Sequence, residues 1–216
     1  MNLTFSEPRA GCDFDLIIAV CGYESRSRHI LDVRDDRGSR KIAIGYAAGE
    51  AAAFEANRNA FLGAGYTLES VPDSDYETFI ESLVRSVRHD TKSVIRVLID
   101  ISCFTRLRLA QTIEAIFESG PFDLEVFYSL AEFSRPQLEE PQNEYLCPVT
   151  EYLSGWTGDV EKAVVLVSGL GYEQMMALGI IEHIDPYDLW LFSPASPIRS
   201  YDEEVLVANE LLMSSV

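Results

Sequence analysis

A continuous apolar run near the N-terminus, DLIIAVC at 15–21, constrains the fold of this 216-residue chain more than any other feature. An uninterrupted run of strand length is the pattern of a strand buried on both faces, which is typical of parallel sheets covered by helices. Gly22 follows the run and permits a tight turn, and residues 25–31 can start a helix. The chain therefore opens with a strand–turn–helix unit.

The same alternation continues through the first 130 residues. Further strands are predicted at 41–46, 66–71, 93–101 and 124–130, and further helices at 50–62, 76–87 and 106–118. Strands that alternate with helices predict parallel pairing with right-handed crossovers. The predicted fold class is α/β: a Rossmann-like, mostly parallel sheet with helices on both faces.

The pattern restarts after a segment rich in Pro, Glu and Gln, with strands at 163–168 and 188–192 and helices at 172–183 and 202–213. When the two parts are aligned, Gly22-Tyr23-Glu24 falls on Gly171-Tyr172-Glu173, and Ala56-Asn57 falls near Ala208-Asn209. Two matches in one order predict an internal repeat; a chance match of short motifs is the alternative. The predicted organisation is a Rossmann-like domain at 1–135, a connector at 136–160 and a partial second βαβα unit at 161–216. That partial unit is expected to pack against the first sheet or against another chain.

The composition and charge of the chain make some classes of function less expected than others. The formal net charge of −18 disfavours general nucleic-acid binding, because such a surface repels polyanions. Basic residues nevertheless persist between residues 22 and 41, which suggests a small anionic ligand, with a mixed solvated face as the alternative for residues 34–41. No apolar run approaches the length of a membrane span, and the N-terminus lacks a secretory pattern, so a soluble cytoplasmic protein is expected. The four cysteines show no metal-like spacing, and neither a metal nor a cofactor is predicted.

Two polar loops follow predicted strands, at the edge of the sheet where open parallel sheets bind ligands. The first is Cys21–Arg26, in which Gly22, Tyr23, Glu24 and Arg26 are candidate ligand-binding residues. Free amides at the following helix start and the arginine would favour an anion. The alternative is a structural turn with a packed tyrosine and a glutamate that caps the helix. The single glycine does not make a dinucleotide-binding fingerprint.

The second loop, Asp100–Arg106, places a carboxylate, two hydroxyls, a thiol and an arginine before a helix. Candidate ligand-binding residues here are Asp100, Ser102, Thr105 and Arg106, although an isolated Asp at a strand end is often only a helix cap. Cys103 lacks the arginine spacing of a phosphatase loop, because the sixth residue after it is Leu109, and a small buried cysteine is the favoured interpretation. No catalytic triad or paired catalytic carboxylates can be assembled.

The second Gly-Tyr-Glu turn differs from the first in its surroundings. It keeps the glycine and the glutamate but has Met175 and Met176 where the first turn has arginines. A methionine pair on a helix is expected to belong to a core. The second turn is therefore predicted to pack rather than to bind an anion.

Asp100, Ser102 and Arg106 also fit a short pattern: Asp or Asn, any residue, Ser or Thr, three residues, then Arg or Lys. In this loop the pattern resembles the CRISPR-associated Rossmann-fold (CARF) domain and each half of the SAVED domain of anti-phage signalling systems. The resemblance covers residues 14–131, with a weaker echo at 163–213. It implies binding of a cyclic oligonucleotide across a dimer or tandem pair, with Gly22, Ser102, Thr105 and Arg106 facing the ligand. The chain departs from the family in its incomplete second copy and in lacking a recognisable effector segment.

Three functions remain open from the sequence. The leading hypothesis is a small-nucleotide-binding sensor or regulatory module in antiviral defence, acting as a homodimer or through an effector protein partner. The second is a nucleotide hydrolase or transferase that uses the Asp100–Arg106 loop. The third is a non-catalytic subunit whose acidic second half docks on a basic partner.

Overall fold

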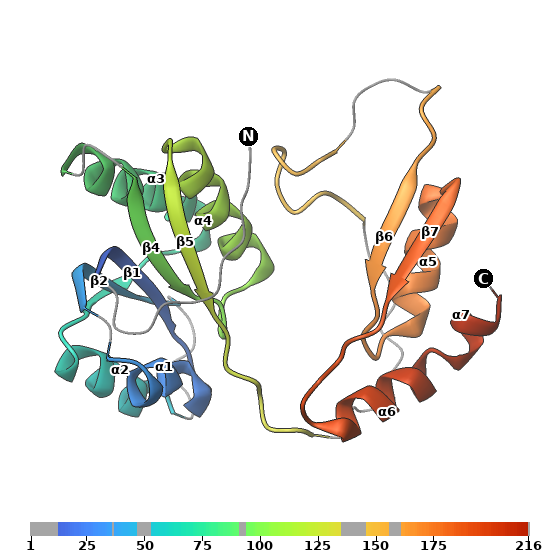
Figure 1. Ribbon diagram of the computed structural model, residues 1–216, viewed down its shortest axis with the longest axis horizontal. Coiled ribbons are helices and arrows are strands. Elements are labelled where there is room, and N and C mark those ends of the chain that lie inside the picture. The colour runs from blue at the N-terminus through green and yellow to red at the C-terminus, as the bar shows by residue number, and fades with distance from the viewer. Residues whose placement is uncertain are drawn as a thin grey trace. The chain divides into compact units, whose positions relative to one another are not determined.

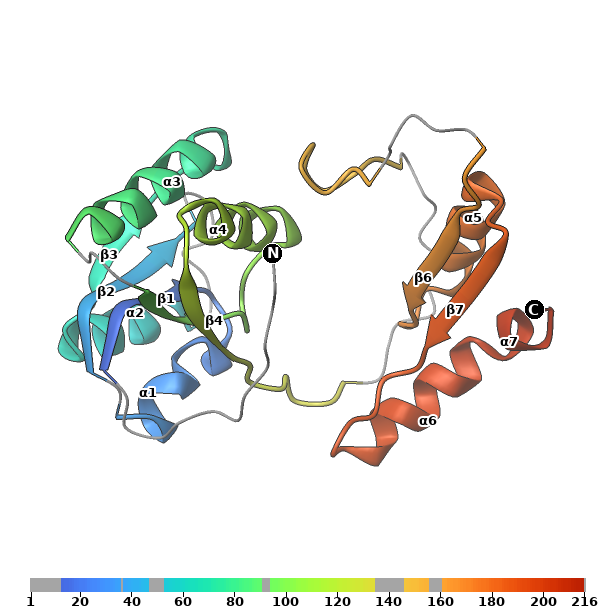
Figure 2. The ribbon, with the colours of Figure 1, turned by 45° about the horizontal axis from the view of Figure 1, so that its top comes forward.

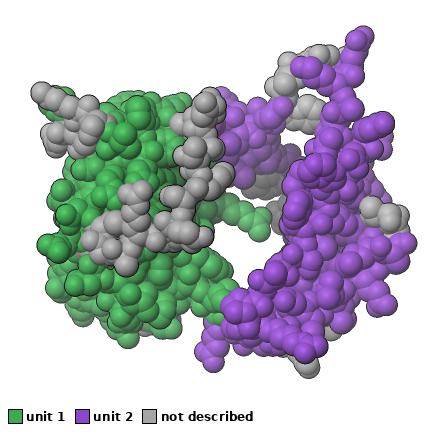
Figure 3. All heavy atoms as spheres, in the orientation of Figure 1, with its two compact units in different colours: residues 1–131 green, residues 132–216 purple. Residues whose placement is uncertain are grey.

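The computed structural model describes residues 13–35, 37–46, 53–90, 94–134, 146–155 and 161–215. The chain divides into two compact units, residues 1–131 and residues 132–216, which Figure 3 shows in green and purple. No helix in the described part of the chain is both long enough and apolar enough to cross a membrane.

Unit 1 alternates strands with helices, as the sequence predicts. In chain order its elements are β1 (Asp13–Cys21), the 3-10 helix η1 (Ser25–Arg28), α1 (His29–Val33), β2 (Arg37–Gly45), α2 (Phe54–Gly63), β3 (Thr67–Ser70), α3 (Asp73–Asp90), β4 (Ile95–Asp100), α4 (Arg106–Glu118) and β5 (Phe122–Phe127). The five strands form one sheet in the order β3-β2-β1-β4-β5, and every neighbouring pair is parallel. The predicted α/β, Rossmann-like fold class is confirmed.

Both faces of this sheet are covered because the side chains of each strand alternate between two cores. Leu16 and Ile18 of β1 pack in the core that contains residues of α3 and α4. Ile17 and Ala19 pack in the core that contains residues of α1 and α2. Figures 1 and 2 show α3 and α4 on one side of the sheet and α1 and α2 on the other. This is why residues 16–21 are apolar at every position rather than at alternate ones.

Unit 2 contains a shorter arrangement of the same kind. Its elements are β6 (Val165–Gly169), α5 (Gln174–Ile184), β7 (Asp188–Phe192), α6 (Arg199–Ala208) and α7 (Glu210–Ser215). The two strands pair in parallel, and their small core is Leu170, Val205 and Leu212, with further half-buried residues packed around them. A partial second set of βα units is therefore present, with two strands among the described residues of this unit.

Several predicted boundaries differ from the structure; β2, for example, begins at Arg37 rather than at residue 41. Two of the differences arise from tertiary contacts. The fifth strand ends at Phe127 rather than at residue 130, and the chain continues to Ser129, which contacts both polar loops. The last predicted helix is divided into α6 and α7 around Asn209, whose side chain donates to the turn that follows β6. The bounds of α4 and β7 agree with the predictions.

Candidate functional site

The two polar loops meet at the point where the order of the sheet reverses. From β1 the chain moves outward to β2 and β3, and it then returns to the other side of β1 to form β4. The carboxyl ends of β1 and β4 are adjacent there, and open α/β sheets bind ligands at such a switch point. The approach is close, because a Cβ atom added to Gly22 would lie 3.3 Å from the Cβ of Cys103. The second loop therefore leaves little room for a side chain at position 22.

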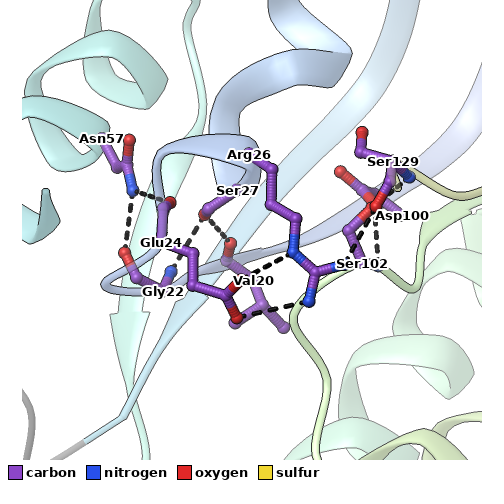
Figure 4. A network of polar contacts seen from close by, with 9 residues as sticks. All are labelled: Val20, Gly22, Glu24, Arg26, Ser27, Asn57, Asp100, Ser102 and Ser129. Atoms are coloured by element: carbon purple, nitrogen blue, oxygen red, sulfur yellow. Dashed lines mark hydrogen bonds and ion pairs between the residues drawn. The ribbon is translucent and has the colours of Figure 1, made fainter. Parts of the chain in front are cut away.

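The backbone of the first turn is held by internal hydrogen bonds (Figure 4). The Gly22 amide donates to Ser27 Oγ at 3.0 Å, and Ser27 Oγ donates to the Val20 carbonyl at 2.6 Å. Asn57 of α2 donates through Nδ2 to the carbonyls of Gly22 (2.9 Å) and Glu24 (2.7 Å). Because the Gly22 amide is engaged within the protein, it is not a free donor for an anion. Any anion at this turn has to be bound by other groups.

The Glu24 carboxylate does not cap the following helix, contrary to the structural alternative drawn from the sequence. It instead accepts two hydrogen bonds from Arg26, from Nε at 2.7 Å and from Nη2 at 3.3 Å. Arg26 Nη1 also donates to the Ser129 carbonyl at 2.9 Å, which ties the first turn to the segment after β5. The Glu24 hydrogen bond raises the pKa of Arg26, which is therefore a fixed cation at this edge.

Two tyrosines lie at the same edge with exposed side chains. Tyr23, in the first turn, is exposed rather than packed, which contradicts the structural alternative for this residue. Tyr128 is also exposed, and the Arg26 guanidinium lies 6.0 Å from the centroid of its ring. Exposed aromatic rings beside a cation are surfaces on which a planar base can stack.

Asp100 and Ser102 of the second loop are buried and bonded to each other (Figure 4). The Ser102 amide donates to Asp100 Oδ1 at 3.0 Å, and the Ser102 hydroxyl donates to the same oxygen. Ser102 Oγ also accepts from the Ser129 amide at 2.7 Å. Both side chains therefore position the loop and the segment after β5. Ser129 Oγ itself is buried without a hydrogen-bond partner among the described residues.

Burial sets the protonation of the reactive groups in this loop. It raises the pKa of Cys103 to about 11, and the Glu24 charge acts in the same direction, so the side chain is a thiol at neutral pH. Burial also raises the pKa of Asp100, while the hydrogen bonds from Ser102 oppose that change. A thiol is a weak nucleophile compared with a thiolate, and this environment does not activate Cys103.

The N-terminus of α4 lies directly after the second loop and adds Thr105 and Arg106 to the candidate site. Thr105 is its N-cap: the hydroxyl accepts from the Arg108 amide at 3.4 Å, and the Thr105 amide donates to Tyr46 Oη at 2.8 Å. Arg106, the first residue of this thirteen-residue helix, is exposed and has no side-chain partner in the described part of the chain. Its charge adds to the positive end of the helix dipole.

Arg108 is a central residue that the sequence did not single out. It is buried, and it donates to Asp73 Oδ1 (2.7 Å) and to the carbonyls of Val71 (2.6 Å) and Gly45 (3.4 Å). Its guanidinium lies between the rings of Tyr46 and Tyr76, at 4.3 Å and 4.7 Å from their centroids. It therefore fastens α4 to the ends of β2 and β3. The only signal in the sequence was an arginine two residues after another at a helix start.

In the sequence, Asn57 stands out only because it falls near Asn209 when the two parts of the chain are aligned. Its spacing from Phe54 and Phe61 places it on the buried face of α2, where a polar side chain needs a partner. That spacing signals a structural hydrogen bond but does not identify the acceptor, which lies 35 residues away.

The second Gly-Tyr-Glu turn has an equivalent contact in unit 2. Asn209 donates through Nδ2 to the Gly171 carbonyl at 2.7 Å and to the Val205 carbonyl at 2.8 Å. Met175 is exposed, so the expectation that the methionine pair belongs to a core is wrong for this residue, and Met176 is half-buried. No cation follows this turn in the sequence until Arg199.

No protein-family model and no curated protein sequence matches this chain. The functional argument therefore rests on the site itself. Within the described ranges, no group of three or more His, Cys, Asp or Glu residues is placed to hold a metal ion.

Proposed function

We propose that unit 1 is a binding module for a small nucleotide, which it takes up at the switch point between β1 and β4. The observation that carries this proposal is the convergence of three segments there: the first turn, the second loop and the residues after β5. They bring together the kinds of group a nucleotide needs, cations for phosphate and exposed aromatic rings for a base.

The charge distribution supports an anionic ligand of limited size. Arg106, at the start of α4, has no side-chain partner among the described residues and can bind a phosphate directly, whereas Arg26 is paired with Glu24 and can do so only by exchanging that bond. The net charge of the protein is −18, so a long polyanion would be repelled by the remaining surface. A ligand with one to a few phosphates suits this arrangement.

The Ser129 hydroxyl supplies a second, independent argument. A buried polar atom without a partner needs an explanation, and a ligand is one of the few available. The atom belongs to the residue that both Arg26 and Ser102 hold through its backbone. We assign it as a contact to the bound nucleotide, with Asp100 and Ser102 as the groups that position it.

The CARF resemblance supports a cyclic oligonucleotide as the ligand and a regulatory role as a homodimer or with an effector partner. The enzymatic alternative has less support, because Cys103 is a thiol and Asp100 accepts hydrogen bonds from its own loop. We therefore favour binding over catalysis at this site.

Thermal unfolding in the presence of cyclic di-, tri- and tetranucleotides, ATP and NAD tests the proposal. A ligand that binds the folded state stabilises it by about 2.7 kcal/mol at a hundred times its Kd. We expect one of the cyclic nucleotides to raise the melting temperature and to be recovered unchanged. An absence of any shift across the panel contradicts the proposal, and conversion of the ligand favours the enzymatic alternative.

Two variants locate the binding. Arg106→Ala should weaken binding about tenfold, because it removes a charged contact worth roughly 1.5 kcal/mol, whereas Arg85→Ala, on the exposed face of α3, is the matched control and should not. Ser129→Ala keeps the backbone bonds and removes only the unpartnered hydroxyl. It should leave the free energy of unfolding unchanged or slightly higher, while weakening the ligand severalfold. Equal affinities for Ser129→Ala and the parent chain would show that the ligand does not reach this hydroxyl.

A further inference from the structure

The sheet of unit 2 has one face that carries large apolar side chains and is open to solvent. Val165 and Val167 of β6 are 48% and 60% exposed, and Trp190 and Phe192 of β7 are 55% and 56% exposed. The register pairs Val167 with Trp190, so the four side chains lie on the same face. We call these four residues the open face of unit 2. A contiguous exposed apolar patch is typical of a protein–protein interaction site.

Each residue of the open face has a buried counterpart in unit 1. Aligning Gly171 with Gly22 places Val165 on Leu16 and Val167 on Ile18. The register of each sheet then places Trp190 on Ile42 and Phe192 on Ile44. All four counterparts are 3% exposed or less.

The counterparts are buried because α3 and α4 lie on them. Leu16, Ile18, Ile42 and Ile44 belong to one core with residues of those two helices. The opposite face of the unit 2 sheet has its own cover, since Leu191 packs with Leu170 and Val205 beneath α5 and α6. Unit 2 therefore presents the face that helices cover in unit 1, without helices of its own upon it in the described residues.

The net charge of unit 2 favours a basic partner over a second copy of this chain as the molecule that covers the open face. Residues 132–216 contain 15 acidic and 3 basic side chains, whereas residues 1–131 contain 20 and 14. Asp188, in register with Val165, places one of these carboxylates at the start of β7. Two copies of unit 2 meeting through their open faces would oppose two strongly acidic surfaces, while a basic partner would be attracted.

We infer that the open face of unit 2 is a docking surface for a partner protein that presents an amphipathic helix with a basic margin. The apolar side of that helix takes the place that α3 and α4 hold in unit 1, and its Lys and Arg side chains meet the acidic surroundings. This inference does not depend on the nucleotide site, because it concerns the other unit and different residues.

Trp190 provides a direct readout. The chain has two tryptophans, and Trp156→Phe leaves Trp190 as the only one. This full-length variant is titrated with a synthetic Leu/Lys amphipathic helix of about 18 residues, long enough to be helical, and with the same peptide carrying Glu for Lys. We expect the Leu/Lys peptide to shift Trp190 emission to the blue and the Leu/Glu peptide to have no effect. Binding of the Leu/Lys peptide should weaken about tenfold or more as salt rises through the range that screens surface charge.

A matched pair of substitutions ties the signal to the open face. Val167→Asp lies on it, and Val207→Asp adds the same charge at an exposed position of α6. We expect Val167→Asp to weaken the Leu/Lys peptide about tenfold or more, which is 1.4 kcal/mol per tenfold, and Val207→Asp to leave its affinity within about twofold.

Other results overturn the inference. A blue shift that appears with rising protein concentration and no peptide would make a second copy of the chain the occupant. Emission that is already blue in the dilute protein would show that the chain covers this face itself. An equal response to both peptides, no response to either, or an unchanged affinity in Val167→Asp would remove the basic helix as the partner.

Discussion

The two Gly-Tyr-Glu turns share one backbone contact and differ in what surrounds it. In both, an asparagine from later in the chain donates to the glycine carbonyl: Asn57 of α2 to Gly22, and Asn209, between α6 and α7, to Gly171. Around the first turn lie Arg26, the second polar loop and the residues after β5. The contact is therefore part of how this strand–turn–helix unit folds, and the candidate chemistry comes from the additional strands that only unit 1 has.

The sheets of the two units also share a pattern and differ in what surrounds it. In unit 1, helices bury the apolar side chains on both faces of the sheet, whereas in the described part of unit 2 they bury those on one face. A pattern that completes a core in one unit leaves an interaction surface in the other. Both tryptophans lie in residues 132–216, so tryptophan emission reports on unit 2, while circular dichroism reports on both units. The comparison can therefore be tested unit by unit.

The largest expected effect concerns Arg108, which has no equivalent in unit 2. Arg108→Leu removes three hydrogen bonds, two of them to the carbonyls of Gly45 and Val71 and one to Asp73. We expect unit 1 to lose about 3 kcal/mol of unfolding free energy. In urea the circular dichroism transition of unit 1 should move to lower concentration, and the tryptophan transition should not. A shift of both by the same amount would mean that the units unfold together.

Removing the shared asparagines should affect the units unequally. Asn57→Ala removes both side-chain hydrogen bonds to the turn, although the Glu24 carbonyl keeps the Ser27 amide as a donor, and we expect a loss of about 2 kcal/mol in unit 1. Asn209→Ala removes one bond to the turn and one to its own helix, with an expected loss of about 1–2 kcal/mol in unit 2. The two variants are compared by the same pair of probes. A larger loss for Asn209→Ala would reverse the order inferred from the contacts.

Substitution of the glycine in each turn should change the unfolding free energy by less than the changes above, but by clearly different amounts in the two units. An alanine methyl at position 22 meets the Cβ of Cys103 at 3.3 Å, and Gly22→Ala should cost about 1–2 kcal/mol as the loops move apart. At position 171 the nearest atom is the end of the flexible Glu173 side chain, so Gly171→Ala should cost less than about 0.5 kcal/mol. Urea midpoints measure both. Equal costs would indicate that the close approach of the loops is not what selects glycine at position 22.

The smallest effect is a dependence on pH that arises from Asp100. Its pKa is raised in the folded protein, so between the ordinary value of 3.8 and the raised value the folded state holds the extra proton. The unfolding free energy attributable to this group is therefore highest at low pH and falls as pH rises through that window. Asp100→Asn keeps an acceptor for Ser102 and removes the titration. At each pH, urea unfolding gives the difference in unfolding free energy between the variant and the parent chain. This difference should be more favourable to the variant at pH 7.5 than at pH 4. The opposite trend would show that the hydrogen bonds and Arg26 outweigh burial.

Much of the fold could be predicted from the sequence because it follows from local patterns. The apolar run at 16–21 indicates a strand buried on both faces, and the alternation of such strands with helices indicates parallel pairing. The same reasoning placed the Cys21–Arg26 and Asp100–Arg106 loops at the carboxyl edge of the sheet. That they meet there follows from the strand order β3-β2-β1-β4-β5, which the sequence did not reveal.

Tertiary structure alone decided what the polar residues do. Arg108 and Asn57 each bond to groups at least 33 residues away, and a single sequence does not identify partners at that distance. Ser129 lies in the site because β5 ends at Phe127 and the backbone that follows it bonds to both loops. Likewise, the consecutive apolar residues of β6 and β7 give both sheet faces apolar side chains, but only the packing of helices determines which face is covered. Local periodicity selects secondary structure, whereas burial depends on which segments come together in space, and the open face of unit 2 is the consequence.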